Sequence, residues 1–330
     1  MNEWHKPIEE LSDAAQGYLF SSVATNLIYL GDITAVVEPS LRSINWFVQN
    51  EQWVEAASAA GPLVSMLIAA GDLSKAISLM NDMQAVIGKS QNLLVIAMAA
   101  NFRAYVYYLN GQIALAKENF DHSEKVLNRL QPADSLPLPT ISSYYCKFLL
   151  DTGKQQEALE RSLKTFAWRE QRTWQVAIDT TSLLATDLLV LGLTFLQIGD
   201  HINAKIQLDK QVELFKSADE WLYLPTGLNS RARLHIATEN FGEALRDLQE
   251  SLEISLRTGA RFGEWEAYID MAQLYYKRHK YDLSSEYLKK AFDLPNMDKY
   301  RFRDGEVSEL LENLSSKMSK STREHDSSSQ

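Results

Sequence analysis

The sequence predicts an all-α solenoid of about seven antiparallel helix pairs. A short turn motif, most often Gly-Asp, recurs at steps of 40, 40, 42, 46, 40 and 40 residues. A fixed period of this length is typical of stacked supersecondary units. Small residues stand at fixed distances from each turn, and no stretch shows the sustained alternation expected of a strand. The residues at the turns are Gly31, Gly71, Gly111, Gly153, Gly199, Glu239 and His279.

The positions around each turn describe two helices in close contact. Antiparallel helices approach closely only where side chains are small, and bulky residues one turn away fill the grooves beside them. Glycine ends the first helix in a left-handed cap, and the aspartate that often follows it is placed to cap the second helix. Seven residues before the turn stand Ala24, Val64, Ala104, Cys146, Gly192, Ala232 and Ala272, and five after it stand Val36, Ala76, Ala116, Ala158, Ala204, Ala244 and Ser284.

Proline and serine mark the boundaries along the chain. Residues 131–140 (QPADSLPLPT) hold three of the eight prolines. They predict a linker, either a hinge or a rigid corner, between units one to three (residues 1–130) and units four to seven (residues 141–296). Residues 297–314 are expected to form a capping helix over the last unit, and the Ser-rich residues 315–330 a disordered tail.

Composition narrows the possible partners. The formal net charge of −10 argues against nucleic acid, which favours a basic surface. The single cysteine, Cys146, can form no internal disulfide, and its place in the small-residue series favours packing over nucleophilic chemistry. The most apolar run, residues 182–198, is interrupted by polar residues such as Asp187, and the first residues do not read as a signal peptide. We therefore expect a cytoplasmic protein without a membrane partner.

The motifs of catalysis are missing. Residues 88–90 (GKS) resemble the end of a phosphate-binding loop, but Met83 stands where its first glycine is required. The six histidines are scattered, and none forms a zinc-binding HExxH motif or a Cys–His cluster. No Gly-x-Ser-x-Gly nucleophile elbow occurs. We expect neither enzyme activity, nor a cofactor, nor a metal.

The spacing around the turns resembles the tetratricopeptide (TPR) repeat. The match is most complete in residues 264–294, where Ala272, Tyr275, Tyr281 and Ala291 stand at the characteristic positions. The period of about 40 residues exceeds the usual 34, and the additional residues lie between units. The resemblance implies that the helix pairs stack into a right-handed superhelix.

From about residue 131 to residue 314 the chain resembles a narrower group. It is similar to the C-terminal TPR region of bacterial signalling proteins that also carry STAND-type NTPase modules. That family typically has Arg where Thr226 stands, and two adjacent arginines where Arg301-Phe302-Arg303 stands. The resemblance implies a sensing or scaffolding region without the NTPase. The phrases that carry it are SSYYCKFLL (142–150), LPTGLNSRA (224–232), ALRDLQESLEI (244–254) and YRFRD (300–304).

A TPR superhelix presents its concave face on the first helix of each pair, at positions ten, six and three residues before the turn. Amide side chains there could hold a peptide backbone, and cations could pair with carboxylates. Leu189, Leu193 and Leu196 of unit five are interpreted as packing residues. The candidate partner-binding residues are Asn101, Tyr105, Tyr108, Ser143, Lys147, Asn229, Arg233, Gln273 and Tyr276.

The leading hypothesis is a non-enzymatic scaffold or adaptor that binds a protein or peptide, acidic in character, along this groove. One alternative is a peptide-sensing regulator, and another is a TPR subunit of a bacterial NTPase or defence signalling complex. A third view treats the groove as a solvated surface whose tyrosines pack on the next helix. The occupant could be a peptide, a partner helix or the chain's own tail.

Overall fold

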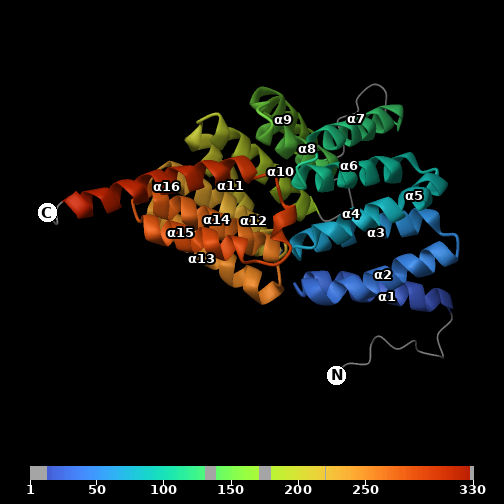
Figure 1. The fold of residues 1–330 in the computed structure, drawn as a ribbon. Helices are drawn as coiled ribbons and strands as arrows, with labels where there is room; N and C mark the ends of the chain where they lie inside the picture. The colour runs from blue at the N-terminus through green and yellow to red at the C-terminus, as the bar shows by residue number, and fades with distance from the viewer. Residues whose placement is uncertain (1–12, 131–138, 171–179, 220, 328–330) are drawn as a thin grey trace.

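The computed structural model describes residues 13–130, 139–170, 180–219 and 221–327. These residues form sixteen α-helices and one short 3-10 helix, with no strand among them. Figure 1 shows the chain as a succession of antiparallel helix hairpins stacked side by side. The predicted all-α solenoid is confirmed, and the handedness of its superhelix stays a prediction.

The helices follow the predicted seven pairs. In the second pair the second helix is divided in two at Met83. The pairs are α1 (Asp13–Tyr29) with α2 (Ile33–Gln49), α3 (Trp53–Ala69) with α4 (Leu73–Asp82) and α5 (Gln84–Ser90), α6 (Leu93–Leu109) with α7 (Ile113–Leu130), α8 (Pro139–Asp151) with α9 (Gln155–Glu170), α10 (Thr180–Gln197) with α11 (His201–Ser217), α12 (Leu224–Ala237) with α13 (Phe241–Thr258), and α14 (Arg261–Lys277) with α15 (Tyr281–Phe292). The 3-10 helix η1 (Met297–Lys299) and α16 (Asp304–Ser327) follow.

All seven predicted turn residues adopt the left-handed conformation. The φ angles of the five glycines lie between +72° and +82°, and Glu239 and His279 reach +60° and +58° without glycine. The same backbone hydrogen bonds form at each turn. In one of them, the amide of the residue after the turn position donates to the carbonyl four residues before that position. This bond joins Asp32 to Leu27 at 3.1 Å in unit one and Asn240 to His235 at 2.8 Å in unit six. These bonds satisfy the last carbonyls of the first helix, which explains why the turn persists where glycine is lost.

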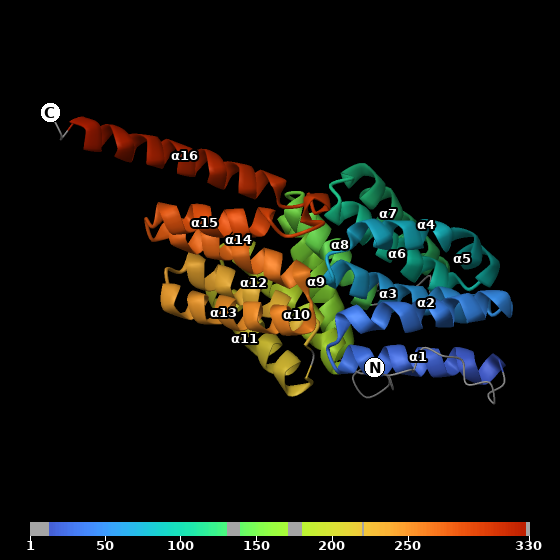
Figure 2. The same cartoon turned by 60° about the horizontal axis from the view of Figure 1, so that its bottom comes forward.

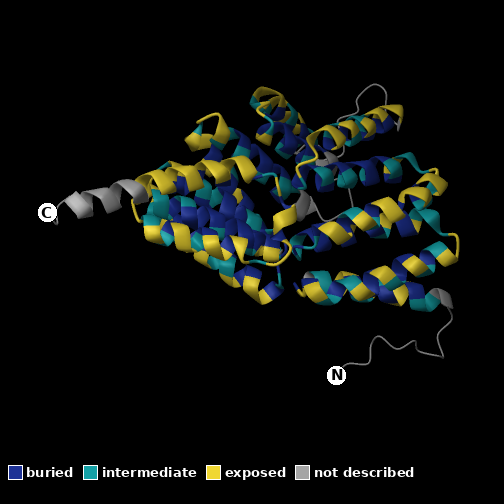
Figure 3. Ribbon diagram, in the orientation of Figure 1, coloured by how far each residue is buried: buried dark blue, intermediate teal, exposed yellow. Residues whose placement is uncertain are grey.

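The small residues lie at the contact within each pair, as predicted. The seven residues that stand five after the turn are fully buried, at 0% exposure. At Gly192 a Cβ atom would come within 2.7 Å of the Leu208 side chain, so only glycine allows α10 and α11 to approach this closely. Figure 3 shows the buried residues along the inner faces of the helices, with exposed residues on the outer faces.

The solenoid curls until α14 of its last pair contacts α3 of its second pair. The residues from Met297 to Arg303, here called the closing segment, lie against the turns of units two and three. The Tyr300 hydroxyl donates to the Ile68 carbonyl at 2.7 Å, and the Arg301 amide donates to the Leu109 carbonyl at 2.7 Å. Asn110 in turn donates to the Lys299 carbonyl at 2.9 Å. Figures 1 and 2 show this part of the chain, just before α16, beside the ends of the N-terminal helices.

The bounds of the linker and of the capping helix differ from those predicted from the sequence. Residues 131–138 of the expected linker lie outside the described residues, and Pro139 and Thr140 already belong to α8. The expected capping helix begins only at Asp304, because residues 297–303 form the closing segment. It then continues to Ser327, where a disordered tail was expected from residue 315. Neither proline nor glycine occurs after Gly305, so the backbone contains no residue that would end the helix.

A comparison of Gly111 with Gly199 separates the energetic cost of backbone strain in a turn from the cost of a clash with the closing segment. Gly111 and Gly199 are both left-handed, but a Cβ atom on Gly111 would lie 2.9 Å from the Cβ of Arg301, whereas one on Gly199 would meet no atom within 4 Å. We expect Gly199→Ala to lower the free energy of unfolding by about 1 kcal/mol, through backbone strain alone. Gly111→Ala should cost more, because Arg301 must also move. Urea unfolding of the two variants measures the difference, and equal losses would contradict the tight closing contact.

Candidate binding cavity

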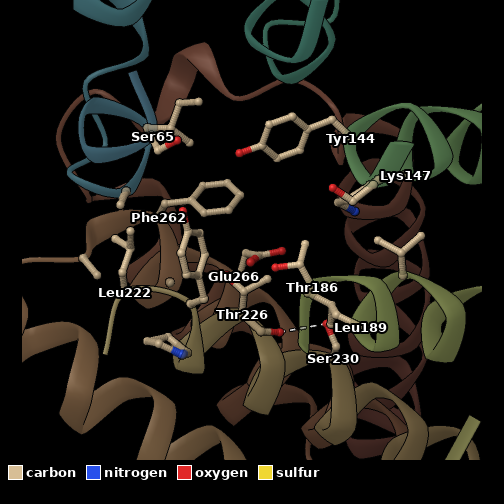
Figure 4. A pocket seen from close by; sticks show the side chains of 18 of the residues that line it. Ser65, Tyr144, Lys147, Thr186, Leu189, Leu222, Thr226, Ser230, Phe262 and Glu266 are labelled. Atoms are coloured by element: carbon tan, nitrogen blue, oxygen red, sulfur yellow. Dashed lines mark hydrogen bonds between the residues drawn. The ribbon is translucent and has the colours of Figure 1, made fainter. Parts of the chain in front are cut away.

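An interior cavity of about 230 Å³ lies within the curl of the solenoid. Its wall is formed mainly by the first helix of six successive pairs, α3, α6, α8, α10, α12 and α14, together with Phe215 of α11 and residues that precede α12 and α14. Figure 4 shows their side chains converging on one open space. Most of the lining residues therefore lie on first helices.

Most of the cavity wall is apolar. Leu189, Leu222 and Phe262 contribute hydrocarbon and aromatic surface. Tyr105 and Tyr144 line it as a stacked pair whose ring centroids are 4.0 Å apart. Burial raises the pKa of Tyr144, and the hydrogen bond between this tyrosine and Ser65 acts in the opposite direction. An apolar wall of this kind, with a few polar groups, is typical of ligand sites.

Polar groups also line the cavity. Thr226 and Ser230 lie on α12, and the Ser230 hydroxyl donates to the Thr226 carbonyl at 2.8 Å. Lys147, Arg233 and Glu266 are the charged residues of the wall.

The lining residues follow two positions of the repeat. Six residues before the turn, units two to six contribute Ser65, Tyr105, Lys147, Leu193 and Arg233. Thirteen residues before the turn, units five to seven contribute Thr186, Thr226 and Glu266. The cavity thus crosses the helices obliquely, from their C-terminal half in early units to their N-terminal half in late units. Such a shift follows when each helix pair is rotated relative to the one before it.

A buried ionic cluster borders the cavity. Arg233 donates to Glu266 and to Asp270, both at 2.8 Å. Arg303 of the closing segment donates to Asp270 at 2.6 Å and to both carboxylate oxygens of Glu306 at 2.6 and 2.7 Å. Burial opposes the ionisation of Glu306, but the charge and hydrogen bonds of Arg303 outweigh it and lower the pKa of Glu306 to about 2. Arg303 therefore connects the closing segment to the cavity wall.

Four of the nine residues predicted from the sequence line the cavity: Tyr105, Ser143, Lys147 and Arg233. The other five lie elsewhere. Tyr108 borders a separate surface pocket, where its hydroxyl donates to Asp151. Asn101 and Asn229 are buried, at 2% and 0% exposure, and Asn229 donates to the Gly263 carbonyl at 3.1 Å. Gln273 and Tyr276 are half-buried on α14, outside the cavity lining.

The cations on which an acidic partner was expected are engaged within the chain. Arg233 is held by two buried carboxylates, and Lys147 lies 3.3 Å from Asp151 and 5.2 Å from the centre of the Phe302 ring. A partner carboxylate would have to displace these in-chain anions. The sequence could not reveal this, because Arg233 and Asp270 belong to different helix pairs.

Several lining residues were missed from the sequence. Thr186, Thr226 and Glu266 stand one helical turn before the positions that were considered, on the same helix face. Extending the series of ten, six and three residues by one more turn would have found them. Leu189 and Leu193, interpreted as packing residues, also face the cavity.

Cys146, the single cysteine, is buried in the core. Burial raises the pKa of the Cys146 thiol to about 11, so this cysteine is held as a neutral core group. The described parts of the chain bring no three His, Cys, Asp or Glu side chains together in a way that could hold a metal ion. None of the described helices combines the length and apolar character needed to cross a membrane.

Comparison with known proteins identifies the fold. No family model and no curated protein matches this sequence. Among solved structures, a Rap protein complexed with Competence and Sporulation Factor is similar at a TM-score of 0.62 and 10% identity, over 88% of this chain and 77% of that one. A STAND protein with a tetratricopeptide repeat sensor, from Pyrococcus horikoshii, is similar at a TM-score of 0.52 and 16% identity, over 84% of this chain and 42% of that one. The chain has the TPR fold. At these identities the likeness extends to the fold and no further.

A buried ion pair holds the α10 wall of this TPR cavity against α9. Arg169 donates to Asp187 at 2.5 Å, and both side chains are almost completely buried, at 6% and 4% exposure. Burial raises the pKa of Asp187 to about 6, although Arg169 acts in the opposite direction. Since the folded chain holds this proton more tightly than the unfolded chain, this group favours folding below its folded pKa and loses that contribution as the pH rises through about 4 to 6.

Arg169→Met should expose this pH dependence. The variant leaves the Asp187 carboxylate buried without its cation, and should lower the free energy of unfolding by about 3 kcal/mol at neutral pH. At about pH 5 the loss should be smaller, because Asp187 becomes protonated and no longer needs a partner. Urea unfolding at both pH values measures the recovery. In the control, Arg169→Met with Asp187→Asn, the recovery should disappear, and equal losses at both pH values in the single variant would contradict this account.

Proposed function

We propose that the protein is a non-enzymatic interaction module that holds a segment of a partner protein or peptide at the interior cavity. One observation carries the proposal: first helices from six successive pairs converge on a single, mostly apolar space. A residue that enters this space contacts elements from most of the chain at once. Of the nine residues singled out from the sequence, the proposal retains Tyr105, Ser143, Lys147 and Arg233.

The size of the cavity limits what can enter. Its volume of about 230 Å³ is below the roughly 300–1,000 Å³ of pockets that enclose drug-sized ligands. An anchor side chain or the end of a peptide fits this space, whereas a whole partner helix does not. The rest of the partner would then follow the curl outside the cavity.

A peptide-sensing regulator is the second candidate, and the closure of the solenoid favours it. The cavity lies between units that the closing segment ties together, so a ligand within it would act on the curvature of the whole array. Two similar structures, a Rap protein complexed with Competence and Sporulation Factor and a STAND protein with a TPR sensor, agree with such a role. Membership of an NTPase or defence complex stays a prediction from the sequence.

Filling the cavity tests the proposal. Leu189→Trp places a larger side chain in the wall, and Leu163→Trp makes the same exchange at a position on α9 that is 45% exposed. Peptides are first selected from a displayed random library against the unaltered protein, and their affinities are measured by fluorescence anisotropy. We expect Leu189→Trp to weaken binding by about tenfold or more, since the anchor can no longer enter, and Leu163→Trp to leave it unchanged. Circular dichroism checks that both variants remain helical.

Equal binding by the unaltered protein and by Leu189→Trp would place the binding surface outside the cavity and contradict the proposal. Weaker binding by both tryptophan variants would also contradict it, because the effect would then not depend on the cavity.

A further inference from the structure

We propose that the group which enters the cavity is an organic cation, a protonated amine or guanidinium carried on an apolar or aromatic stem. This inference rests on the proposed function and adds the chemical class of the ligand. It reverses the charge expected from the sequence alone. A basic side chain of a peptide, or its free amino terminus, has this chemistry.

The first observation is an incompletely bonded carboxylate in the cavity wall. Glu266 is 1% exposed and lines the cavity from α14. Its Oε1 atom accepts a hydrogen bond from Arg233 at 2.8 Å, but its Oε2 atom is buried and accepts none. Figure 4 shows the carboxylate end of Glu266 directed toward the open centre of the cavity. A buried charged oxygen without a donor is destabilising, so a donor supplied by a ligand would be favoured.

The second observation is the balance of charge around Glu266. The ionic cluster contains two guanidinium groups, Arg233 and Arg303, but three carboxylates, Glu266, Asp270 and Glu306. Lys147 also acts on Glu306, but it is paired with Asp151, so these two residues together add no net charge to the cluster. One negative charge therefore exceeds the cations at this side of the cavity. An entering cation would balance it, whereas an entering carboxylate would add to the excess.

The remaining wall suits the other parts of such a ligand. An ammonium group has three donors, and the hydroxyl oxygens of Thr226 and Ser230 lie in the same wall as Glu266. Phe262 and the stacked Tyr105–Tyr144 pair offer aromatic faces for an apolar stem and for cation–π contact. Hydrogen-bond acceptors, negative charge and aromatic surface therefore lie around one small space.

Three small probes of the same shape test the inference. 2-Phenylethylamine, 2-phenylethanol and phenylacetate share an aromatic stem and differ in charge, and their binding to the full chain is measured by isothermal titration calorimetry. We expect the amine to bind about tenfold or more tightly than the alcohol, from a charged hydrogen bond, and the acid to bind most weakly. This ranking needs no variant and stays informative if a substitution disturbs folding.

Two variants that remove the same charge then locate the interaction. Glu266→Gln should remove the advantage of the amine over the alcohol and leave the affinity for the alcohol unchanged. As the control, Glu118→Gln removes an exposed carboxylate on α7 that lies outside the cavity wall and the ionic cluster. Because solvent screens this group, the variant should change the affinity for the amine by less than about threefold.

The possible outcomes separate the inference from the proposed function. Equal binding of all three probes, or preference for the acid, overturns the cationic ligand and leaves a binding cavity in place. An amine preference that survives in Glu266→Gln also overturns the assignment. Failure of every probe to bind overturns the inference, and the proposed function is then decided by the Leu189→Trp experiment.

Discussion

The attachment of the closing segment to the turns of units two and three is the contact on which the shape of this protein depends. In most solenoids each repeat contacts only its neighbours, so curvature follows from many small rotations. Here Tyr300 donates to the carbonyl of Ile68, a residue 232 positions away, and Arg301 and Asn110 add two more bonds between the ends of the array. These bonds bring α3 and α6 opposite α12 and α14, and the cavity exists because all four lie around it.

The closing segment also takes part in the ionic cluster beside the cavity. Arg303 ends the segment and donates to Asp270, which is bound on its other side by Arg233 of the cavity wall. The position of the segment and the charge state of the wall are therefore parts of one hydrogen-bonded network. Buried ionic networks of this kind are sensitive to the loss of any single member, since the remaining charges keep the cost of burial without their partners.

Counting residues back from each turn predicted part of the candidate site, and the rotation of successive helix pairs explains the lining residues that were missed. Tyr105, Lys147 and Arg233 were found because they stand six residues before their turns, where the first helices face inward. Glu266 was missed because successive pairs rotate, which moves the inward face toward the N-terminal half of the later helices. Asn229 was expected in the groove because it stands ten residues before its turn, but its amide is buried and bonded to Gly263.

By itself the sequence determined the number of helix pairs, the left-handed turns and the small residues at each contact, because these depend on residues close together along the chain. Even Glu239 and His279 could be placed at their turns from spacing alone. Only the tertiary structure decided that residues 297–303 close the ring before α16 begins, that Arg233 is bound within the chain, and that Glu266 faces a cavity. These features depend on the accumulated rotation of the pairs and on contacts between distant residues, which no local pattern encodes.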